Sequence, residues 1–354
     1  MVTLADVARH AGVSASTVSY VLSGKRSISA ATRDRIRRSI EELGYRPHAG
    51  ARALASSRTN ILALMMPIRT DMYVPVLMEI AMAVTTTARA HGYDVLLLTG
   101  EEGPEAVHRV EGSALADAMI VMDVELEDPR LPPLKAAERP AVLIGLPADP
   151  GGLSCVDLDF EAAGAQCVNH LAELGHRQIA VLGEPPAVYA RGTGFAERTL
   201  VGLRGTAAEK SVGLLHRPCD GTYAAVAATV VRIFEERPAT TALVVQNEAA
   251  VEPLLALLRQ QGRAVPEDVS VIAVCAGQVA AEASVPLTSI GVPAQEMGRL
   301  AVERVFAHLE GQEPSGTVLI APELEARGST GPAPAGGPER TGAGERGRRG
   351  HSRR

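Results

Sequence analysis

The sequence holds no tryptophan, and only 3% of its 354 residues are aromatic. Its four cysteines are scattered with no C-x-x-C spacing, which argues against a metal site and favours structural thiols in a reducing cytoplasm. No apolar run approaches the roughly 18 residues of a membrane span, and the mixed, charged start MVTLADVARH is unlike a signal peptide. We therefore expect a cytoplasmic chain with no membrane partner.

Sequence motifs of the common α/β enzymes are also missing. A nucleotide-binding strand should run into G-x-G-x-x-G, but the first strand-like run, ILALMMP, is followed by IRTDMY. The RGTGF segment lacks a third glycine, and there is no Walker loop, G-x-S-x-G or His/Cys cluster. Isolated histidines (His91, His170, His176) are interpreted as surface or cap residues. We expect no enzyme activity and no cofactor.

Charge is distributed unevenly along the chain. Residues 1–60 hold 10 Lys/Arg against 4 Asp/Glu, and residues 329–354 hold 6 against 2. The middle, 61–328, therefore carries a net charge of −16, from 19 basic and 35 acidic residues. A basic N-terminal part on an acidic body suggests contact with a polyanion, although a basic solvated face would give the same count.

Three short helices are predicted in the first sixty residues. Thr3 caps the first, and Ser14 caps the second after a tight turn at Gly12. The third follows the cap Ser29 and stops at Gly44. Two helices joined by a short turn containing glycine form a helix-turn-helix, whose second helix enters the DNA major groove.

The second helix, in VSASTVSYVLSG, has an apolar stripe and an uncharged outer face. Val18, Val21 and Leu22 fall at helical spacing, as a buried stripe should. The outer face is small or hydroxyl-bearing apart from one tyrosine: Ala15, Ser16, Ser19 and Tyr20. Phosphates repel acids and bulky side chains prevent close approach, so this face suits base edges. A small-residue helix packed against another helix is the alternative.

The stretch TLADVARHAGVSASTVSYVLSGKRSISAATRDRIRRSIEELGYRP resembles the headpiece of the LacI/GalR family of bacterial transcriptional repressors. The resemblance implies that Ala15, Ser16 and Tyr20 contact bases. It implies that a second set holds or approaches the DNA backbone: Thr3, Ser14, Thr17 and Ser19. Basic side chains near the end of the second helix, Lys25 and Arg26, are expected to contact phosphates.

The segment HAGARALASSRTN is similar to the hinge helix of that family, which folds on the operator. Its residues Arg52 and Leu54 are assigned to DNA binding, and Leu54 matches the leucine that is inserted between bases in the minor groove. One hinge is too short for this, so the interpretation requires a homodimer with paired hinges and a palindromic operator. A plain flexible linker is the alternative.

In the body, strand-like apolar runs alternate with amphipathic helical segments. About ten such strands predict two doubly wound α/β lobes with parallel sheets. Segments such as HLAELGHRQIAVLG and VPEDVSVIAV resemble the family's effector domain, whose fold is shared with periplasmic sugar-binding proteins. The resemblance covers about residues 2–328, and a cleft between two such lobes is a common small-ligand site.

Five positions in that cleft are implied by the resemblance. Arg191 matches an arginine that bridges ligand oxygens, Asn247 a polar contact, Tyr73 an aromatic contact, and Asp159 a recurring acid. A surface ion pair for Arg191 and a helix cap for Asn247 remain open. At Cys275 the family commonly has an acid that accepts hydrogen bonds from ligand hydroxyls. We therefore expect an effector that is no ordinary neutral monosaccharide, or no small effector at all.

Together these features predict a small all-α helix-turn-helix headpiece joined to a two-lobed α/β effector domain. The expected parts are the headpiece 1–46, the hinge 47–59, the effector and dimerisation domain 60–328, and a disordered basic tail 329–354. The predicted function is a sequence-specific, nucleoid-associated repressor that forms dimers, with a tetramer left open. The alternative is an α/β enzyme or free binding protein with an incidental helical N-terminus. The sequence predicts neither the operator nor the effector, nor whether the effector acts as an inducer or a corepressor.

Overall fold

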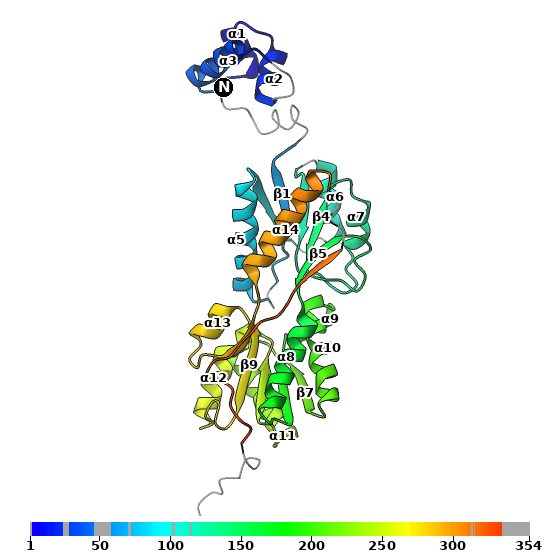
Figure 1. Ribbon diagram of the computed structural model, residues 1–354, viewed down its shortest axis with the longest axis vertical. Coiled ribbons are helices and arrows are strands. Elements are labelled where there is room, and N and C mark those ends of the chain that lie inside the picture. The colour runs from blue at the N-terminus through cyan, green and yellow to red at the C-terminus, as the bar shows by residue number, and fades with distance from the viewer. Residues whose placement is uncertain are drawn as a thin grey trace, which may run out of the picture. The chain divides into compact units, whose positions relative to one another are not determined.

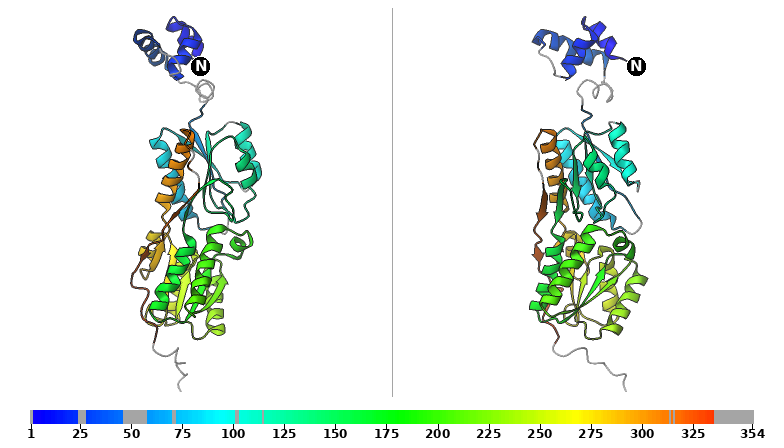
Figure 2. Two further views of the ribbon diagram at one scale, coloured as in Figure 1. Left: turned by 45° about the vertical axis from the view of Figure 1, so that its right-hand side comes forward. Right: turned by 90° about the vertical axis from the view of Figure 1, so that its right-hand side faces the viewer.

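The computed structural model shows three short helices at the N-terminus and an α/β body with two six-stranded sheets (Figures 1 and 2). The chain divides into unit 1, Met1–Asp157 with Ala294–Leu319, and unit 2, Leu158–Pro293 with Ile320–Arg354. The residues that the structure describes are 2–23, 28–45, 58–69, 72–100, 103–113, 115–312, 314 and 316–334. No helix among them is long and apolar enough to cross a membrane.

The described part of the headpiece, residues 2–23 and 28–45, folds as its caps predict. Its helices are α1 (Leu4–His10), α2 (Ala15–Ser23) and α3 (Ala30–Leu43). Thr3 and Asp6 form a reciprocal capping box, and the Ser29 hydroxyl accepts from the N–H of Thr32. Gly44 ends α3 at a φ of 60°, a left-handed conformation that glycine adopts without a steric penalty.

A small apolar core holds the three headpiece helices together. Val7, Val18 and Ile36, one from each helix, are fully buried, and Tyr45 closes the cluster. Leu22 departs from the sequence prediction: the stripe expected it inside, but it is 36% exposed. Its neighbour Val21 does pack against this core, so the apolar stripe of α2 is buried only as far as Val21.

Unit 1 contains a sheet with strand order β11-β5-β4-β3-β1-β2. Helices α5 and α14 pack on one another, as do α6 and α7, and Figures 1 and 2 show these pairs on opposite faces of the sheet. The elements are β1 (Ile61–Met65), α5 (Val74–Ala90), β2 (Asp94–Leu98), α6 (Pro104–Ser113), β3 (Ala118–Val121), α7 (Leu131–Ala136), β4 (Ala141–Ile144), β5 (Ser154–Leu158), α14 (Ala294–Leu309) and β11 (Thr317–Ile320).

Unit 2 contains a sheet with strand order β12-β10-β9-β8-β6-β7, parallel except for the antiparallel pairing of β12 with β10. Helix α10 packs on α8, and α12 packs on α11. The elements are α8 (Phe160–Glu173), β6 (Gln178–Gly183), α9 (Pro186–Ala190), α10 (Gly194–Glu209), β7 (Gly213–Pro218), α11 (Tyr223–Glu236), β8 (Ala242–Val245), η1 (Glu248–Ala250), α12 (Val251–Gln260), β9 (Ser270–Cys275), α13 (Gly277–Glu282), β10 (Thr288–Gly291) and β12 (Leu324–Glu325).

The doubly wound architecture is confirmed, with twelve strands among the described residues where about ten were expected. The edge strand β7, GLLHRP, is half-buried along most of its length, so it lacks the continuous apolar run that marks the buried strands. The predicted tail was wrong at its beginning. Ser329 is fully buried, donates to the carbonyl of Val271 at 2.6 Å and accepts from the N–H of Thr288 at 2.8 Å. Residues 329–334 thus belong to unit 2, and the rest of the tail lies outside the described residues.

Candidate DNA-binding face and effector site

The outer face of α2 carries no charge in the described structure. Ala15, Ser16 and Tyr20 are exposed, Tyr20 to 37%, whereas Val18 on the opposite face is fully buried. The Ser14 hydroxyl lies 2.8 Å from the hydroxyls of both Ser16 and Thr17 and accepts from the Thr17 N–H at 3.2 Å. The start of α2 therefore presents a row of hydroxyls, each able to donate and accept a hydrogen bond.

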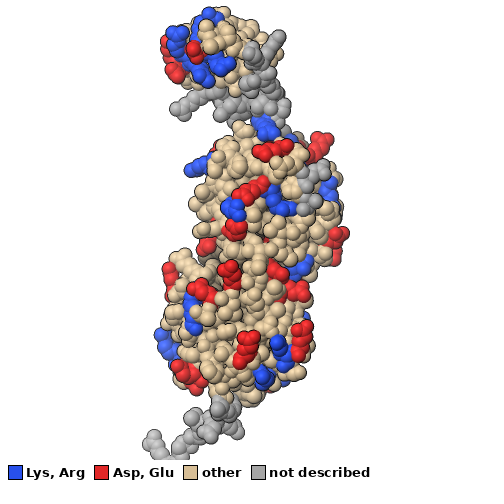
Figure 3. All heavy atoms as spheres, viewed as in Figure 1, with Lys and Arg blue, Asp and Glu red and all other residues tan. Residues whose placement is uncertain are grey.

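The headpiece also carries exposed basic side chains, on helices other than α2. Four arginines of α3 are exposed, and Figure 3 shows Lys and Arg gathered on one side of the headpiece. They are Arg33, Arg35, Arg37 and Arg38. Arg9 on α1 forms an exposed 2.9 Å ion pair with Asp6, so its charge is partly neutralised. The predicted contacts Lys25, Arg26, Arg52 and Leu54 lie outside the described residues.

In unit 2, three predicted effector residues follow neighbouring parallel strands. Arg191 comes after β6 and α9, Asn247 after β8, and Cys275 ends β9. Because β6, β8 and β9 are adjacent and parallel, their carboxyl ends meet at one edge of the sheet, where open α/β sheets bind ligands. Asp159 caps the start of α8, and α8 runs in the opposite direction to β6, the strand that follows it. The start of α8 therefore lies at the carboxyl end of β6, so Asp159 is at the same edge. Tyr73 precedes α5 in unit 1.

Two of these side chains cap helices. Asn247 is 3% exposed; its carbonyl oxygen accepts from the Ala249 N–H at 3.0 Å, and its amide donates to the Cys219 carbonyl at 2.7 Å. Asp159 accepts from the Ala162 N–H at 2.9 Å. The cap interpretation left open for Asn247 is thus correct. One N–H and one lone pair of its amide remain for a ligand.

A hydrogen-bonded network that sequence reasoning missed holds the segment carrying Arg191. The Tyr189 hydroxyl donates to Gln246 Oε1 at 2.7 Å, accepts from the Glu184 N–H at 3.1 Å, and lies 3.1 Å from His216 Nε2. Since its single proton goes to Gln246, His216 must donate from Nε2. Burial lowers the pKa of His216 to about 4, so the ring stays neutral. A Cβ on Gly183 would lie 2.4 Å from His216 Nε2, so the network requires glycine there.

Cys275 packs into the apolar core of unit 2 and is 1% exposed. Burial, followed by the nearby Glu248 carboxylate, raises the pKa of Cys275 to about 12, which keeps it a neutral thiol. Glu248 also accepts a hydrogen bond from the N–H of Ala276. A carboxylate is therefore present beside Cys275, but it belongs to η1, which follows β8, and not to β9.

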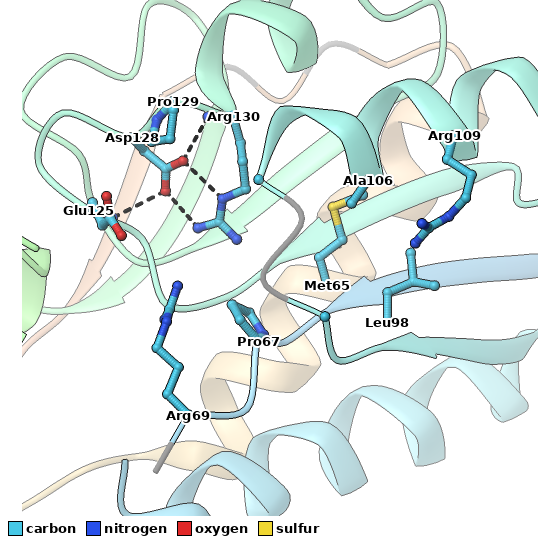
Figure 4. Close-up of a pocket in the computed structure, with 12 residues that line it drawn as sticks. Met65, Pro67, Arg69, Leu98, Ala106, Arg109, Glu125, Asp128, Pro129 and Arg130 are labelled. Carbon is cyan, nitrogen blue, oxygen red and sulfur yellow. Dashed lines mark hydrogen bonds and ion pairs between the residues drawn. The ribbon is translucent and has the colours of Figure 1, made fainter. Parts of the chain in front are cut away.

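Unit 1 has a polar pocket of about 160 Å³ that the sequence did not indicate (Figure 4). Arg130 donates to both carboxylate oxygens of Asp128, at 2.9 Å and 2.6 Å, and to the Asp123 carbonyl at 2.9 Å. Arg69 pairs with Asp123. Burial, then the Asp128 charge, raises the pKa of Glu125 at the pocket edge. The pocket lies at the carboxyl ends of β1 and β2.

Comparison with known proteins agrees with this geometry. Residues 3–48 match the bacterial regulatory proteins of the lacI family, and residues 168–330 match a periplasmic binding protein-like domain. Over 335 residues the chain is 32% identical to the HTH-type transcriptional regulator CelR of Thermobifida fusca, covering 90% of this chain and 95% of that one. The chain belongs to the LacI family. It is thus a transcriptional regulator with a DNA-binding headpiece and an effector-type domain.

Other LacI-family proteins match over similar lengths. The repressor CytR of Escherichia coli K12 is 28% identical over 349 residues, 93% of this chain and 96% of CytR. A structure of the CelR–cellobiose complex superimposes with a TM-score of 0.66 at 28% identity, covering 93% of this chain and all of that one. The lac repressor dimer bound to operator and the anti-inducer ONPF gives 0.81 at 24% identity, covering 93% and 99%, which supports the fold of this LacI-family regulator.

Proposed function

We propose that this LacI-family regulator binds a palindromic operator as a homodimer, represses transcription there, and changes its DNA affinity when a small molecule binds unit 2. The observation that carries the proposal is the uncharged, hydroxyl-rich face of α2 within a basic headpiece. The headpiece that carries this face is basic, with four exposed arginines on α3, and a basic surface attracts the phosphates of a duplex. Against DNA, both features contribute.

Within the operator, α2 lies in the major groove. Ala15, Ser16 and Tyr20 contact base edges, because they are exposed and small enough, or in the case of Tyr20 long enough, to reach them. Four hydroxyls of the headpiece hold phosphates: Thr3, Ser14, Thr17 and Ser19. Lys25, Arg26 and Arg52 add phosphate contacts, and Leu54 enters the minor groove between base pairs.

The homodimer forms through unit 1. Val74, Met78 and Met82 on α5 are exposed to 37%, 38% and 60% and lie four residues apart, so they form one apolar stripe. Leu97 on the edge strand β2 is also exposed, to 41%. An apolar stripe of this kind marks a protein interface, and a second copy supplies a matching surface.

The effector binds at the carboxyl edge of the unit 2 sheet. Arg191, supported by Asp159 and by the remaining groups of Asn247, supplies hydrogen bonds, while Cys275 packs in the apolar core behind them. We propose that Tyr73 adds an aromatic contact. Free monosaccharides bind no more tightly than millimolar, because no carboxylate stands at Cys275 itself. CelR is seen with cellobiose, so cellobiose is included when monosaccharides are tested by calorimetry.

We infer that the protein catalyses no reaction and acts in the cytoplasm at the nucleoid, where its operator lies. The relatives that match it over most of its length are transcriptional regulators. The alternative considered from the sequence, an α/β enzyme with an incidental helical N-terminus, predicts no sequence-specific DNA binding.

Selection of binding sites from a random-sequence DNA pool by the full-length protein separates the two functions. We expect an enriched palindrome, and log affinity for it should fall linearly with log salt with a slope of several units. Failure to enrich any sequence, or a salt slope near zero, would contradict the proposed function. A panel of metabolites then identifies the effector by its change in operator affinity.

A further inference from the structure

The chain enters unit 1 through a densely hydrogen-bonded turn at the end of the predicted hinge. One carboxylate, that of Asp117, accepts three hydrogen bonds from two successive residues. The Thr59 N–H donates to Oδ1 at 2.7 Å, its hydroxyl donates to the same atom at 2.9 Å, and the Asn60 N–H donates to Oδ2 at 2.8 Å. Asn60 has a φ of 56°, a left-handed conformation that Asn tolerates better than most residues.

Arg58 ties this turn to a helix from the far end of the sequence. Its Nη2 donates to the carbonyl of Leu309 at 3.0 Å, and Leu309 is the last residue of α14. The last carbonyls of a helix lack partners within the helix and carry partial negative charge. A guanidinium is therefore well suited to bind there, although Arg58 itself is exposed.

The last turns of α14 are fixed in turn against the start of β2. The Phe306 ring stacks on His91 with centroids 4.0 Å apart and meets the edge of Tyr93 at 4.9 Å. Tyr93 is 7% exposed, and burial together with the adjacent Asp117 charge raises its pKa. A Cβ on Gly298 would lie 2.7 Å from the Cβ of Ala83, so α14 also lies close against α5.

We propose that Arg58 and Asp117 are positioning residues that fix the end of the hinge, Arg58 to α14 and Asp117 to the start of β3, and thereby set the operator affinity of the headpiece. We call Arg58, Thr59, Asn60, Asp117 and Leu309 the hinge anchor. The proposal rests on the DNA-binding function proposed above. Helix α14 begins at Ala294, directly after unit 2 ends at Pro293, and it ends at the anchor. Helix α14 thus begins where the chain re-enters unit 1 and ends at the residue that binds Arg58.

The hydrogen bond from Arg58 to Leu309 is not needed for the stability of unit 1. Arg58 is exposed, and an exposed hydrogen bond contributes little to the stability of a domain. What the anchor fixes is the position of residues 58–60, where the chain enters unit 1. If this end were free, ordering it on DNA would cost conformational entropy. Because the anchor already fixes it, that cost is smaller.

The test uses the full-length protein and the operator that the wild type selects from a random pool. Arg58→Gln and Asp117→Asn are compared with Arg139→Gln, a matched control. Arg139 also lies in unit 1, where it pairs with Glu111 at 2.9 Å and donates to the Glu111 carbonyl at 2.9 Å. Fluorescence anisotropy gives the affinity for the operator and for a scrambled duplex, and thermal unfolding reports stability.

We expect Arg58→Gln and Asp117→Asn each to weaken operator binding by at least about fivefold, the lower end of typical coupling between sites. Affinity for scrambled DNA should change less than twofold, and Arg139→Gln should leave both unchanged. Asp117→Asn separates the anchor from simple electrostatics, because removing a negative charge near DNA would otherwise strengthen binding.

Three results would overturn the hinge anchor. The first is a loss of operator affinity smaller than about fivefold in Arg58→Gln, and the second is tighter operator binding in Asp117→Asn. The third is an equal loss on operator and scrambled DNA in Arg58→Gln, which would make Arg58 a phosphate contact. If the wild type selects no operator, the proposed function itself fails, and that outcome is visible before any variant is measured.

Discussion

Replacing Tyr189 by phenylalanine removes a single oxygen and should destabilise unit 2 substantially. That hydroxyl holds three groups at once: Gln246 Oε1, the Glu184 N–H and His216 Nε2. Gln246 is 3% exposed, so in the variant its Oε1 is left buried without the Tyr189 donor. Glu184 and His216 are only partly buried, so water can replace their lost partner more easily. A buried polar group left unpaired costs about 1–3 kcal/mol, so we expect a total loss of about 2–4 kcal/mol.

The chain offers a matched control for this prediction. Tyr223, also in unit 2, donates one hydrogen bond to Gln260 at 2.6 Å but is 45% exposed, so water can replace its hydroxyl. Tyr223→Phe should therefore cost less than about 0.5 kcal/mol. Urea unfolding of the full chain measures both variants, and hydrogen exchange of unit 2 peptides shows where protection is lost.

Functionally, the loss should concentrate on the segment that carries Arg191. Tyr189 lies on α9, and Gly192, with a φ of 67°, turns the chain directly after Arg191 toward α10. Tyr189→Phe should therefore weaken effector binding more than operator binding. A stability loss below 1 kcal/mol, or one equal to that of Tyr223→Phe, would refute the assignment of this network.

Three further outcomes are expected. Tyr20→Ala should change the ranking of operator variants by roughly 1–3 kcal/mol at one base pair per half-site; an unchanged ranking would remove Tyr20 from the base contacts. Met82→Glu should shift the protein toward monomer in sedimentation experiments, because it places a charge in the apolar stripe of α5; an unchanged dimer would move the interface elsewhere. The pKa of His216 is lowered by burial from about 6.5 to about 4, so the unfolded state binds the proton first as pH falls. Stability should decline from pH 6.5 toward 4, and His216→Gln should decline less; parallel pH profiles would show that His216 contributes nothing.

The sequence predicted the headpiece well because its signals are local. The caps at Thr3 and Ser29 each bind a group three residues along the chain, and Gly44 ends its helix by its own backbone conformation. Such features depend on neighbouring residues only, so they can be recognised in a linear sequence. The same holds for the buried strands of the body, whose apolar runs predict parallel sheets covered on both faces.

Features that depend on distant partners could not be predicted in this way. His176 was expected at the surface or in a cap, yet it is fully buried, with hydrogen bonds to Thr241, Ser270 and the Gly331 carbonyl. Those partners lie 65, 94 and 155 residues away in the sequence. Polar residues of this kind are buried only because the fold supplies every partner, and no local pattern records that.

The candidate sites divide along the same line. The helical spacing of apolar residues in the sequence predicted the uncharged face of α2, since the residues outside the apolar stripe of a helix are exposed. Only the tertiary structure brought Glu248 beside Cys275, placed the Tyr189 hydroxyl between His216 and Gln246, and joined Arg58 to Leu309 across 251 residues. Parallel strands separated by long crossovers align their ends at one edge, so residues far apart in sequence become neighbours when the sheet forms.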